Sequence, residues 1–356
     1  MSVIFEDYKL VCVFCRKLVL AEIPIVCRIF NMPRGKLQIM KVLLVWLIVC
    51  GIWGSNWIFI KFGLADLPPV SFAAWRLAVA IAILLLILAA NKRAFPRDKR
   101  FWILAGATGF FNFFLNFALM FWGVQHISSG LAGVLQASIP VFGLVLAPFY
   151  LPDERITPRK VFAITLGIVG VGTIFYEQLN ISGILALAGG AAIIVGSFFA
   201  AYAGVLTKTH GAKSNSTALL TAQMIIGFVP LALAGLIWEG SPSKFNWSWT
   251  AVFCVLYLAL VGTIAAFWLY YWLLRNIEVT KAMTIALVTP LVAVLIGTFF
   301  GETLQRQTLA GGALILLSVG LIVFQPKKES APEKAEEKLL KHENSELDVT
   351  PLEATN

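Results

Sequence analysis

Charged residues are scarce in this sequence, and the long apolar runs contain almost none. Asp, Glu, Lys and Arg make up 13% of the 356 residues, whereas hydrophobic residues make up 59%. A run of about 20 apolar residues has the length that an α-helix needs to cross a bilayer. The scarcity of charge therefore excludes a soluble globular protein and predicts an all-α integral membrane protein.

Carboxylates are absent from the interior of the apolar runs. Glu154, Glu177, Glu239, Glu278 and Glu302 all fall at the ends of runs or in the loops between them. A transporter that exchanges protons for a lipophilic cation needs a carboxylate at membrane depth. Its absence favours neutral, zwitterionic or anionic ligands over organic cations.

Catalytic and metal-binding patterns are also absent. The three histidines are scattered, the five cysteines suggest no disulfide framework, and the HExxH, GxSxG and GxxxxGK[ST] motifs do not occur. The CxxC pair of Cys12 and Cys15 has no second pair and no nearby histidine. The sequence therefore predicts no enzyme, no metal site and no cofactor, and an ATP-driven mechanism would need a separate subunit.

Ten apolar segments lie between an N-terminal extension and a charged tail. The extension, residues 1–40, contains two candidate start residues, Met32 and Met40. The tail, residues 326–356, has the composition of a disordered cytoplasmic segment. The predicted spans lie near residues 41–63, 70–90, 101–123, 129–151, 161–176, 183–206, 217–238, 249–273, 282–301 and 309–325.

The first five spans, residues 41–176, resemble the second five, residues 183–325. Pro140 aligns with Pro290 and Glu154 with Glu302, an offset of about 150 residues. Because five is an odd number, the second copy must enter the membrane with the opposite orientation. The sequence thus predicts ten transmembrane helices arranged as two inverted five-helix repeats, an architecture of secondary transporters.

Basic residues are distributed unequally between the loops. With the N-terminus inside, twelve Lys and Arg residues fall in cytoplasmic loops, whereas the outer loops hold only Lys244 and Arg306. This bias follows the positive-inside rule and places both termini in the cytoplasm. The net charge of +9 is thereby explained by membrane topology, and nucleic acid is not expected as a partner.

Several segments resemble the EamA-type members of the drug/metabolite transporter superfamily. They are WGSNWIFIKFGL at 53–64, AWRLAVA in the second span, SSGLAGVLQASIPVFGLVLAPFYLPDERIT through the fourth, and FGETL after the ninth. The resemblance covers residues 41–325 and implies a ten-helix fold that exports amino acids or other small metabolites. The run Pro152-Asp153-Glu154 departs from the family's usual ending of a small residue, Gly and Glu, and the family does not fix the substrate.

Lys61 and Arg76 are the two charged residues within the spans. Ionisable groups at membrane depth are costly, so both are candidates for binding a substrate carboxylate in an outer vestibule. Two other interpretations stay open. The long side chains extend to the membrane interface, or they pair with Asp66 or Glu177 on the outer side.

Uncharged polar and aromatic residues complete the predicted substrate path. Each buried amide is placed either to bind substrate or to bond a neighbouring helix, and the aromatic residues are candidates for a gate or a cavity wall. These residues are Trp57, Asn112, Asn116, Gln136, Tyr202 and Gln223.

Pro140 and Pro290 occupy equivalent places in the fourth and ninth spans. Each proline removes a helical hydrogen bond and frees the carbonyl four residues earlier, that of Gln136 or Ala286. Matched interruptions in two repeats predict a central site or a hinge. Simple bending of the helices to fit the bundle is the alternative.

These features predict an inner-membrane secondary transporter that exports small metabolites such as amino acids by alternating access. The path is expected between spans 1–4 and 6–9, whereas spans 5 and 10 are expected at the periphery, where a homodimer contact can form. An importer or exchanger of an organic anion, held by Lys61 and Arg76, is one alternative. A non-transporting membrane sensor is the alternative from another class.

Overall fold

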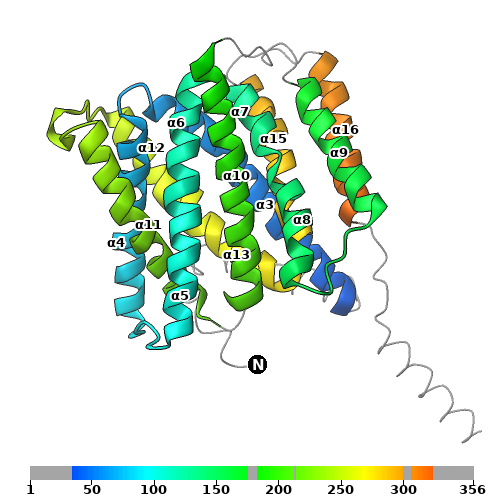
Figure 1. Cartoon of the computed structure of the whole chain (residues 1–356), viewed down its shortest axis with the longest axis horizontal. Helices are drawn as coiled ribbons and strands as arrows, with labels where there is room; N and C mark the ends of the chain where they lie inside the picture. Colours follow the sequence, from blue (N-terminus) through cyan, green and yellow to red (C-terminus); the bar gives the residue numbers. More distant parts are fainter. Residues whose placement is uncertain (1–33, 128, 175–182, 212–213, 300–305, 324–356) are drawn as a thin grey trace, which may run out of the picture. The chain divides into compact units, whose positions relative to one another are not determined.

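The computed structural model describes residues 34–127, 129–174, 183–211, 214–299 and 306–323. The predicted tail, most of the N-terminal extension, and Glu177 and Glu302 lie outside these residues. Every regular element within them is helical (Figure 1). Four long helices run without a break: α3 (Arg34–Gly63), α4 (Pro69–Ala90), α10 (Ile184–Gly211) and α11 (Ser216–Trp238).

Two further rods contain a π-helical segment in their middle. The rod Lys99–His126 consists of α5 (Lys99–Thr108), η2 (Gly109–Asn116) and α6 (Phe117–His126). The rod Trp249–Asn276 consists of α12 (Trp249–Ala259), η5 (Leu260–Ala265) and α13 (Ala266–Asn276). The remaining elements are α7 (Ser129–Gln136), α8 (Ile139–Tyr150), α9 (Pro158–Ile174), α14 (Val279–Met283), α15 (Ile285–Phe299), α16 (Arg306–Val323) and the short η4 (Pro242–Lys244).

Seven helical stretches in the described residues are long and apolar enough to cross a membrane, which makes the chain a multi-pass membrane protein. The other three predicted spans correspond to shorter helices. α9 has 17 residues, and the stretches Val279–Ala293 and Leu309–Ile322 fall among the shorter apolar helices. At 1.5 Å per residue, 17 residues rise about 25 Å, less than the roughly 30 Å of a typical hydrocarbon core. The count of ten spans therefore stays a prediction.

Helix starts in the loops are fixed by polar caps. The Asn215 side chain accepts a hydrogen bond from the Ala218 amide at the start of α11. The Ser248 hydroxyl accepts one from Ala251 at the start of α12. Such caps satisfy amides that have no partner within the helix. The loops therefore set where each apolar run enters the bundle.

Helix packing follows the two predicted repeats. In the first repeat, α3 packs against α12, α13 and α15 of the second. In the second repeat, α10 packs against α5, α6 and α8 of the first. The corresponding helices α4 and α11 pack against each other. This exchange of equivalent contacts is what two related halves facing each other produce, and it puts both π-helical segments between the halves.

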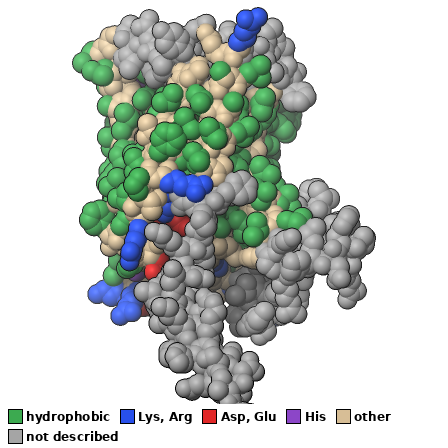
Figure 2. All heavy atoms as spheres, turned by 90° about the vertical axis from the view of Figure 1, so that its right-hand side faces the viewer, with side chains coloured by type: hydrophobic (Ala, Val, Ile, Leu, Met, Phe, Trp, Pro, Cys, Tyr) green, Lys and Arg blue, Asp and Glu red, His purple; other side chains and the backbone are tan. Residues whose placement is uncertain are grey.

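The outer helices α9 and α16 pack closely on each other. The Ser318 hydroxyl donates to the Ala163 carbonyl at 2.6 Å, and a Cβ on Gly167 would lie 2.7 Å from the Ser318 oxygen. Gly167 in the fifth predicted span therefore allows close packing of two helices within one chain. Hydrophobic side chains cover the middle of the side that Figure 2 shows, and Lys and Arg side chains lie mostly toward one end.

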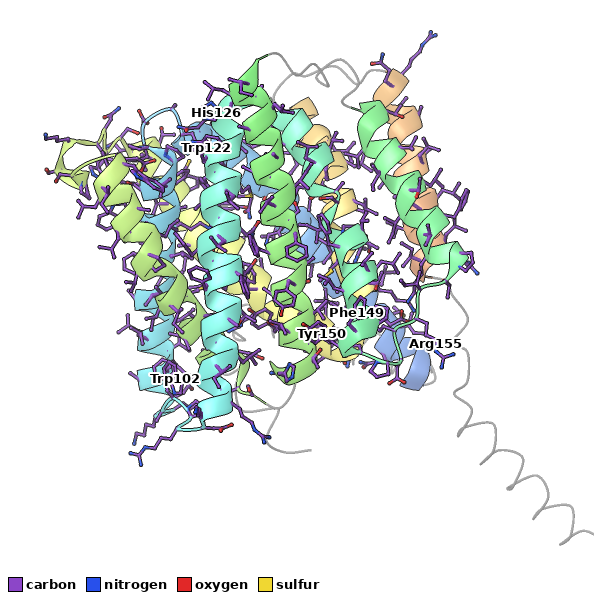
Figure 3. The ribbon with its side chains drawn as sticks, in the orientation of Figure 1. Trp102, Trp122, His126, Phe149, Tyr150 and Arg155 are labelled. Carbon is purple, nitrogen blue, oxygen red and sulfur yellow. The ribbon has the colours of Figure 1, made fainter. Side chains whose placement is uncertain are left out.

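That end carries the loops 91–98, 151–157 and 277–278 and is called the basic end here, since Arg93, Arg97 and Arg155 lie on it. The loops 64–68 and 239–248 lie at the opposite end. Figure 3 shows Trp102 and Arg155 toward the basic end and Trp122 and His126 toward the other. Tryptophan near both ends is typical of membrane interfaces. The side of the membrane that the basic end faces stays a prediction.

Gly109 allows the π-helical segment η2 to approach α11. A Cβ at this position would lie 2.5 Å from the Gln223 carbonyl oxygen and 2.9 Å from its Cα, both backbone atoms that cannot rotate away. We expect Gly109→Ala to lower the free energy of unfolding by about 1–3 kcal/mol, the cost of overpacking. Thermal unfolding in lipid nanodiscs measures it. Gly106→Ala, where nothing lies within 4 Å of the added Cβ, is the matched control, and equal losses in both variants would contradict the close approach.

Candidate functional site

A cavity of about 140 Å³ lies between the two repeats. Its walls come from α3, α4, the two π-containing rods, α10 and the broken spans α7–α8 and α14–α15. This volume is below the roughly 300–1,000 Å³ of drug-sized ligand pockets, so the described conformation suits a small occupant. The polar and aromatic lining residues are Trp53, Asn56, Trp57, Arg76, Thr108, Asn112, Asn116, Phe117, Gln136, Thr207, Phe267, Tyr270, Tyr271 and Thr289.

Arg76 is the charged residue of this wall. Its side chain is 3% exposed. Nε donates to the Thr263 hydroxyl at 2.5 Å and Nη2 donates to the Gly262 carbonyl at 3.1 Å, while the guanidinium lies 5.0 Å from the centre of the Phe117 ring. A guanidinium has five N–H donors, so these two bonds leave donors for another ligand.

No carboxylate of the described residues lines the cavity or forms an ion pair with Arg76. Asp66, one of its predicted partners, instead accepts hydrogen bonds from Asn246 and Ser248 in the α11–α12 loop. The burial of Arg76 also rules out extension of its side chain to the interface. A buried positive charge with neutral hydrogen-bond partners is costly, and an anionic group on a ligand would offset that cost.

The two π-helical segments meet the cavity from opposite repeats, η2 with lining residues and η5 through its bonds to Arg76. Asn112 and Asn116 lie on η2, whereas Gly262 and Thr263, the partners of Arg76, lie on η5. The Thr263 hydroxyl donates to the Leu258 carbonyl at 2.7 Å, five residues earlier, a spacing that a π-helix provides. π-Helical turns often occur at functional sites, and these two lie at corresponding positions of the repeats.

The predicted amides Asn112, Asn116 and Gln136 all line the cavity. Asn116 Nδ2 donates to Asn112 Oδ1 at 3.4 Å, and Gln136 Nε2 lies 3.1 Å from the Met120 sulfur. A bond between two side-chain amides on one rod and a weak bond to sulfur leave most of their capacity unused. These groups are available for a polar ligand.

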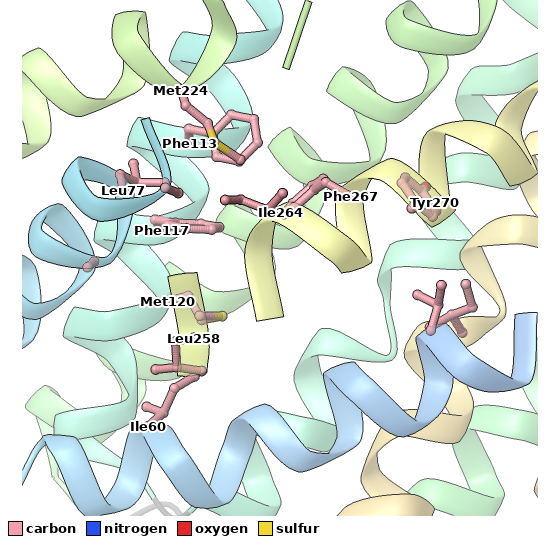
Figure 4. Packing of buried hydrophobic residues seen from close by; sticks show 14 of the residues in the cluster. Ile60, Leu77, Phe113, Phe117, Met120, Met224, Leu258, Ile264, Phe267 and Tyr270 are labelled. Carbon is pink, nitrogen blue, oxygen red and sulfur yellow. The ribbon is translucent and has the colours of Figure 1, made fainter. Parts of the chain in front are cut away.

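Aromatic side chains form the other part of the wall. Trp57, predicted as a cavity residue, lines it together with Trp53, whose ring lies 5.6 Å from that of Phe267 and 5.2 Å from that of Tyr270. Figure 4 shows Phe113, Phe117 and Met120 of one rod beside Ile264 and Phe267 of the other. The aromatic and apolar part of the wall thus suits the apolar part of a ligand.

Three predicted path residues lie elsewhere. Lys61 is exposed and does not line the cavity. The Tyr202 hydroxyl lies 3.1 Å from the Tyr150 hydroxyl, outside the lining. Gln223 is fully buried behind the wall, where its Nε2 donates to the Thr108 hydroxyl at 2.6 Å and its Oε1 accepts from the Tyr271 hydroxyl at 2.5 Å. Gln223 therefore holds two lining residues in place.

The two prolines differ in their position relative to the break in each span. Pro140 lies in the first turn of α8, directly after the break between α7 and α8, where a missing N–H has no cost. Pro290 lies inside α15, and the break in that span falls earlier, at Thr284. The Ala286 carbonyl that Pro290 frees accepts a hydrogen bond from the Thr289 hydroxyl at 3.3 Å. Because this bond replaces the lost one, the helix continues through the proline.

Asn56 is a lining residue that the sequence did not single out. It lies on α3 three residues after Trp53 and four before Ile60, and all three line the cavity. This spacing is that of one helical face, which is the signal that points to Asn56. The spacing alone does not distinguish a cavity-lining residue from one that packs against a neighbouring helix. The position of Asn56 beside η5 is visible only in the structure.

Polar bonds join the two repeats at the basic end. Glu154, which is 4% exposed, follows α8 and accepts hydrogen bonds from the Val279 amide at 2.7 Å and from the Thr280 amide and hydroxyl at 3.3 Å. Lys160 lies 2.8 Å from Glu278 in an ion pair, and Lys281 lies 3.1 Å from the same carboxylate. These contacts fix the start of α14 against the α8–α9 loop and the first turn of α9.

Glu278 makes this end sensitive to acid. Burial acts to raise the pKa of its carboxyl, but the hydrogen bond and charge of Lys160, followed by those of Lys281, outweigh burial and lower the pKa below its ordinary value of 4.5. A lowered native pKa adds stability above the unfolded value, and that stability is lost as the pH falls through the native value. We expect Glu278→Gln to lower the thermal midpoint at pH 7, and we expect its difference from the parent protein to shrink as the pH falls from 7 to 3. A difference that is constant between these pH values would contradict this.

Comparison with known proteins agrees with this architecture. A transporter from Bacillus subtilis (strain 168), the uncharacterized YoaV, is 27% identical over 289 residues, which cover 80% of this chain and 97% of the relative. A protein named as a probable amino-acid metabolite efflux pump of Salmonella typhimurium is 27% identical over 288 residues, covering 78% and 93%. A solved crystal structure matches the fold with a TM-score of 0.69 and 15% identity, covering 80% of this chain and 96% of that one.

A two-repeat helical bundle around a buried cavity is an architecture of membrane transporters. The chain belongs to the EamA-like transporter family, whose model matches it twice, at residues 40–176 and 187–324. The two matches coincide closely with the halves whose helices exchange equivalent contacts. Members of this family are membrane transporters and not enzymes.

Proposed function

We propose that the protein exports small metabolites such as amino acids across the inner, or plasma, membrane by alternating access of its two repeats, with both termini in the cytoplasm. The central observation is the buried Arg76 guanidinium, which lines the cavity with donors to spare and no ion-pair partner among the described residues. A relative of 27% identity named as a probable amino-acid metabolite efflux pump supports the same substrate class.

The rest of the wall supports this proposal. Asn112, Asn116 and Gln136 offer donors and acceptors to a polar ligand, while Trp53 and Trp57 offer apolar surface. The lining carries a positive charge, and no carboxylate of the described residues lines it to balance an organic cation. An amino acid presents both a carboxylate and an apolar side chain, so it uses both kinds of surface.

Exchange or uptake of an organic anion is the second candidate, and the same Arg76 favours it. The clamp of two cations expected for that function is weaker than the sequence indicated, because Lys61 does not line the cavity. A single guanidinium balances the charge of one carboxylate, but it leaves part of the charge of a doubly charged phosphate ester unpaired.

Untargeted mass spectrometry of medium and cells tests the export. A strain that overproduces the intact protein is compared with one that produces Arg76→Ala at the same membrane level. We expect a few amino acids or related carboxylates to accumulate in the medium only with the intact protein. Equal metabolite profiles in the two strains would contradict export and direct the search to uptake of organic anions by reconstituted vesicles.

A further inference from the structure

Asn56 holds a buried, unpartnered acceptor in the wall of the cavity. The side chain is 7% exposed, lines the cavity, and its Oδ1 has no hydrogen-bond partner among the described residues. A buried side-chain oxygen without a donor is costly and rare in folded proteins. A donor brought by a ligand would satisfy it.

Asn56 and Arg76 meet at one residue of η5. The Gly262 carbonyl accepts from Arg76 Nη2 at 3.1 Å, and a Cβ built on Gly262 would lie 2.5 Å from Asn56 Oδ1. The cationic donor and the free acceptor therefore flank the same π-helical residue, and the two residues that carry them line the same small cavity. A ligand that uses both must carry its anionic group and its N–H donor close together.

We propose that Asn56 Oδ1 accepts a hydrogen bond from the ammonium group of a substrate whose carboxylate binds Arg76. The cavity then selects α-amino acids, in which one carbon carries both groups, over the same acids without the amino group. This inference rests on the proposed function and deepens it. The neutral amide suits the ammonium group because a carboxylate at this position would pair with Arg76 and remove its charge from the substrate.

Binding of matched ligand pairs to the full chain in nanodiscs tests the assignment. Isothermal titration compares leucine, valine and alanine with 4-methylpentanoate, 3-methylbutanoate and propanoate, which lack only the amino group. We expect the parent protein to prefer each amino acid by about tenfold or more, as a charge-assisted hydrogen bond provides. In Asn56→Leu the preference should fall to about one, while binding of the three acids changes little. Asn276→Leu, the same change at an exposed residue that ends α13, should keep the preference.

Gly262→Ala provides a second variant should Asn56→Leu fail to fold. Its Cβ would lie within 3.0 Å of all three terminal atoms of the Asn56 side chain, so it displaces the amide and leaves the backbone carbonyl that holds Arg76. The preference should again fall to about one.

The two proposals fail in different ways. A first outcome is that the preference for amino acids is kept in both Asn56→Leu and Gly262→Ala while binding still depends on Arg76. That result overturns the role of Asn56 and leaves the proposed function standing. If none of the six compounds binds, or if Arg76→Gln changes the binding of none, the proposed function fails and the inference fails with it.

Discussion

Arg76→Gln is expected to reduce substrate flux by about 100-fold or more without loss of folded protein. The bond between the buried guanidinium and a substrate carboxylate is lost, and removal of one partner of a buried charged pair costs about 2–5 kcal/mol. Flux of the amino acids found in the medium of the producing strain, measured in proteoliposomes, is the readout. Arg76→Lys keeps the charge but not the two-pronged donor, so its flux should lie between the two.

The thermal stability of Arg76→Gln should not fall with its flux. Arg76 is buried with only neutral partners, and replacing an uncompensated buried charge by a neutral group removes a desolvation cost. We expect the thermal midpoint of Arg76→Gln to equal or exceed that of the parent protein. Arg306→Gln, at an exposed residue of α16 outside the cavity, is the control with normal flux. Wild-type flux in Arg76→Gln would rule out a substrate role for this charge.

The helices of this protein follow from its composition, because long apolar runs cross a bilayer only as helices with all backbone groups paired. The location of Arg76 could not be predicted correctly from the sequence. Its place six residues into the second span indicated an outer vestibule, whereas packing of α4 against η5 buries it in the cavity wall. The partners that decide this, Gly262 and Thr263, lie almost 190 residues further on, and no local pattern connects them.

The π-helical segments were not visible in the sequence for a similar reason. Neither Gly109–Asn116 nor Leu260–Ala265 contains a proline or a polar run that marks a change in helix type. What distinguishes them is tertiary contact, such as the approach of Gly109 to the backbone of α11. The predicted amides Asn112 and Asn116 were found because polar residues in an apolar run stand out, whereas their geometry required the π-turn.

Gln223 shows the limit of polarity as a signal. A glutamine in mid-span has the same appearance in sequence whether it lines a cavity or supports the wall behind it. Here its two bonds go to Thr108 and Tyr271, which themselves line the cavity. The sequence therefore predicted the region of the cavity, but it did not distinguish the residues that line the cavity from those that support its wall.

Glu154→Ala is expected to speed hydrogen exchange of the Val279 and Thr280 amides by about tenfold or more. The carboxylate accepts from both amides at the start of α14, and loss of such a cap costs about 1–2 kcal/mol, or roughly tenfold in local opening. Glu154→Gln, which keeps one acceptor oxygen, should fall between. Mass-resolved exchange of peptides that cover residues 277–283 measures the effect.

The neighbouring carboxylate supplies the control for this change. Asp153 lies in the same loop, is exposed and forms no ion pair among the described residues, so Asp153→Asn should leave exchange in α14 unchanged. Glu154 comes from the first repeat and α14 from the second, so this bond ties the repeats together at the basic end. Alternating access requires contacts between the repeats to break at one end while they form at the other. Faster exchange in Glu154→Ala should therefore be accompanied by altered flux, whereas unchanged exchange would show that α14 is held by packing alone.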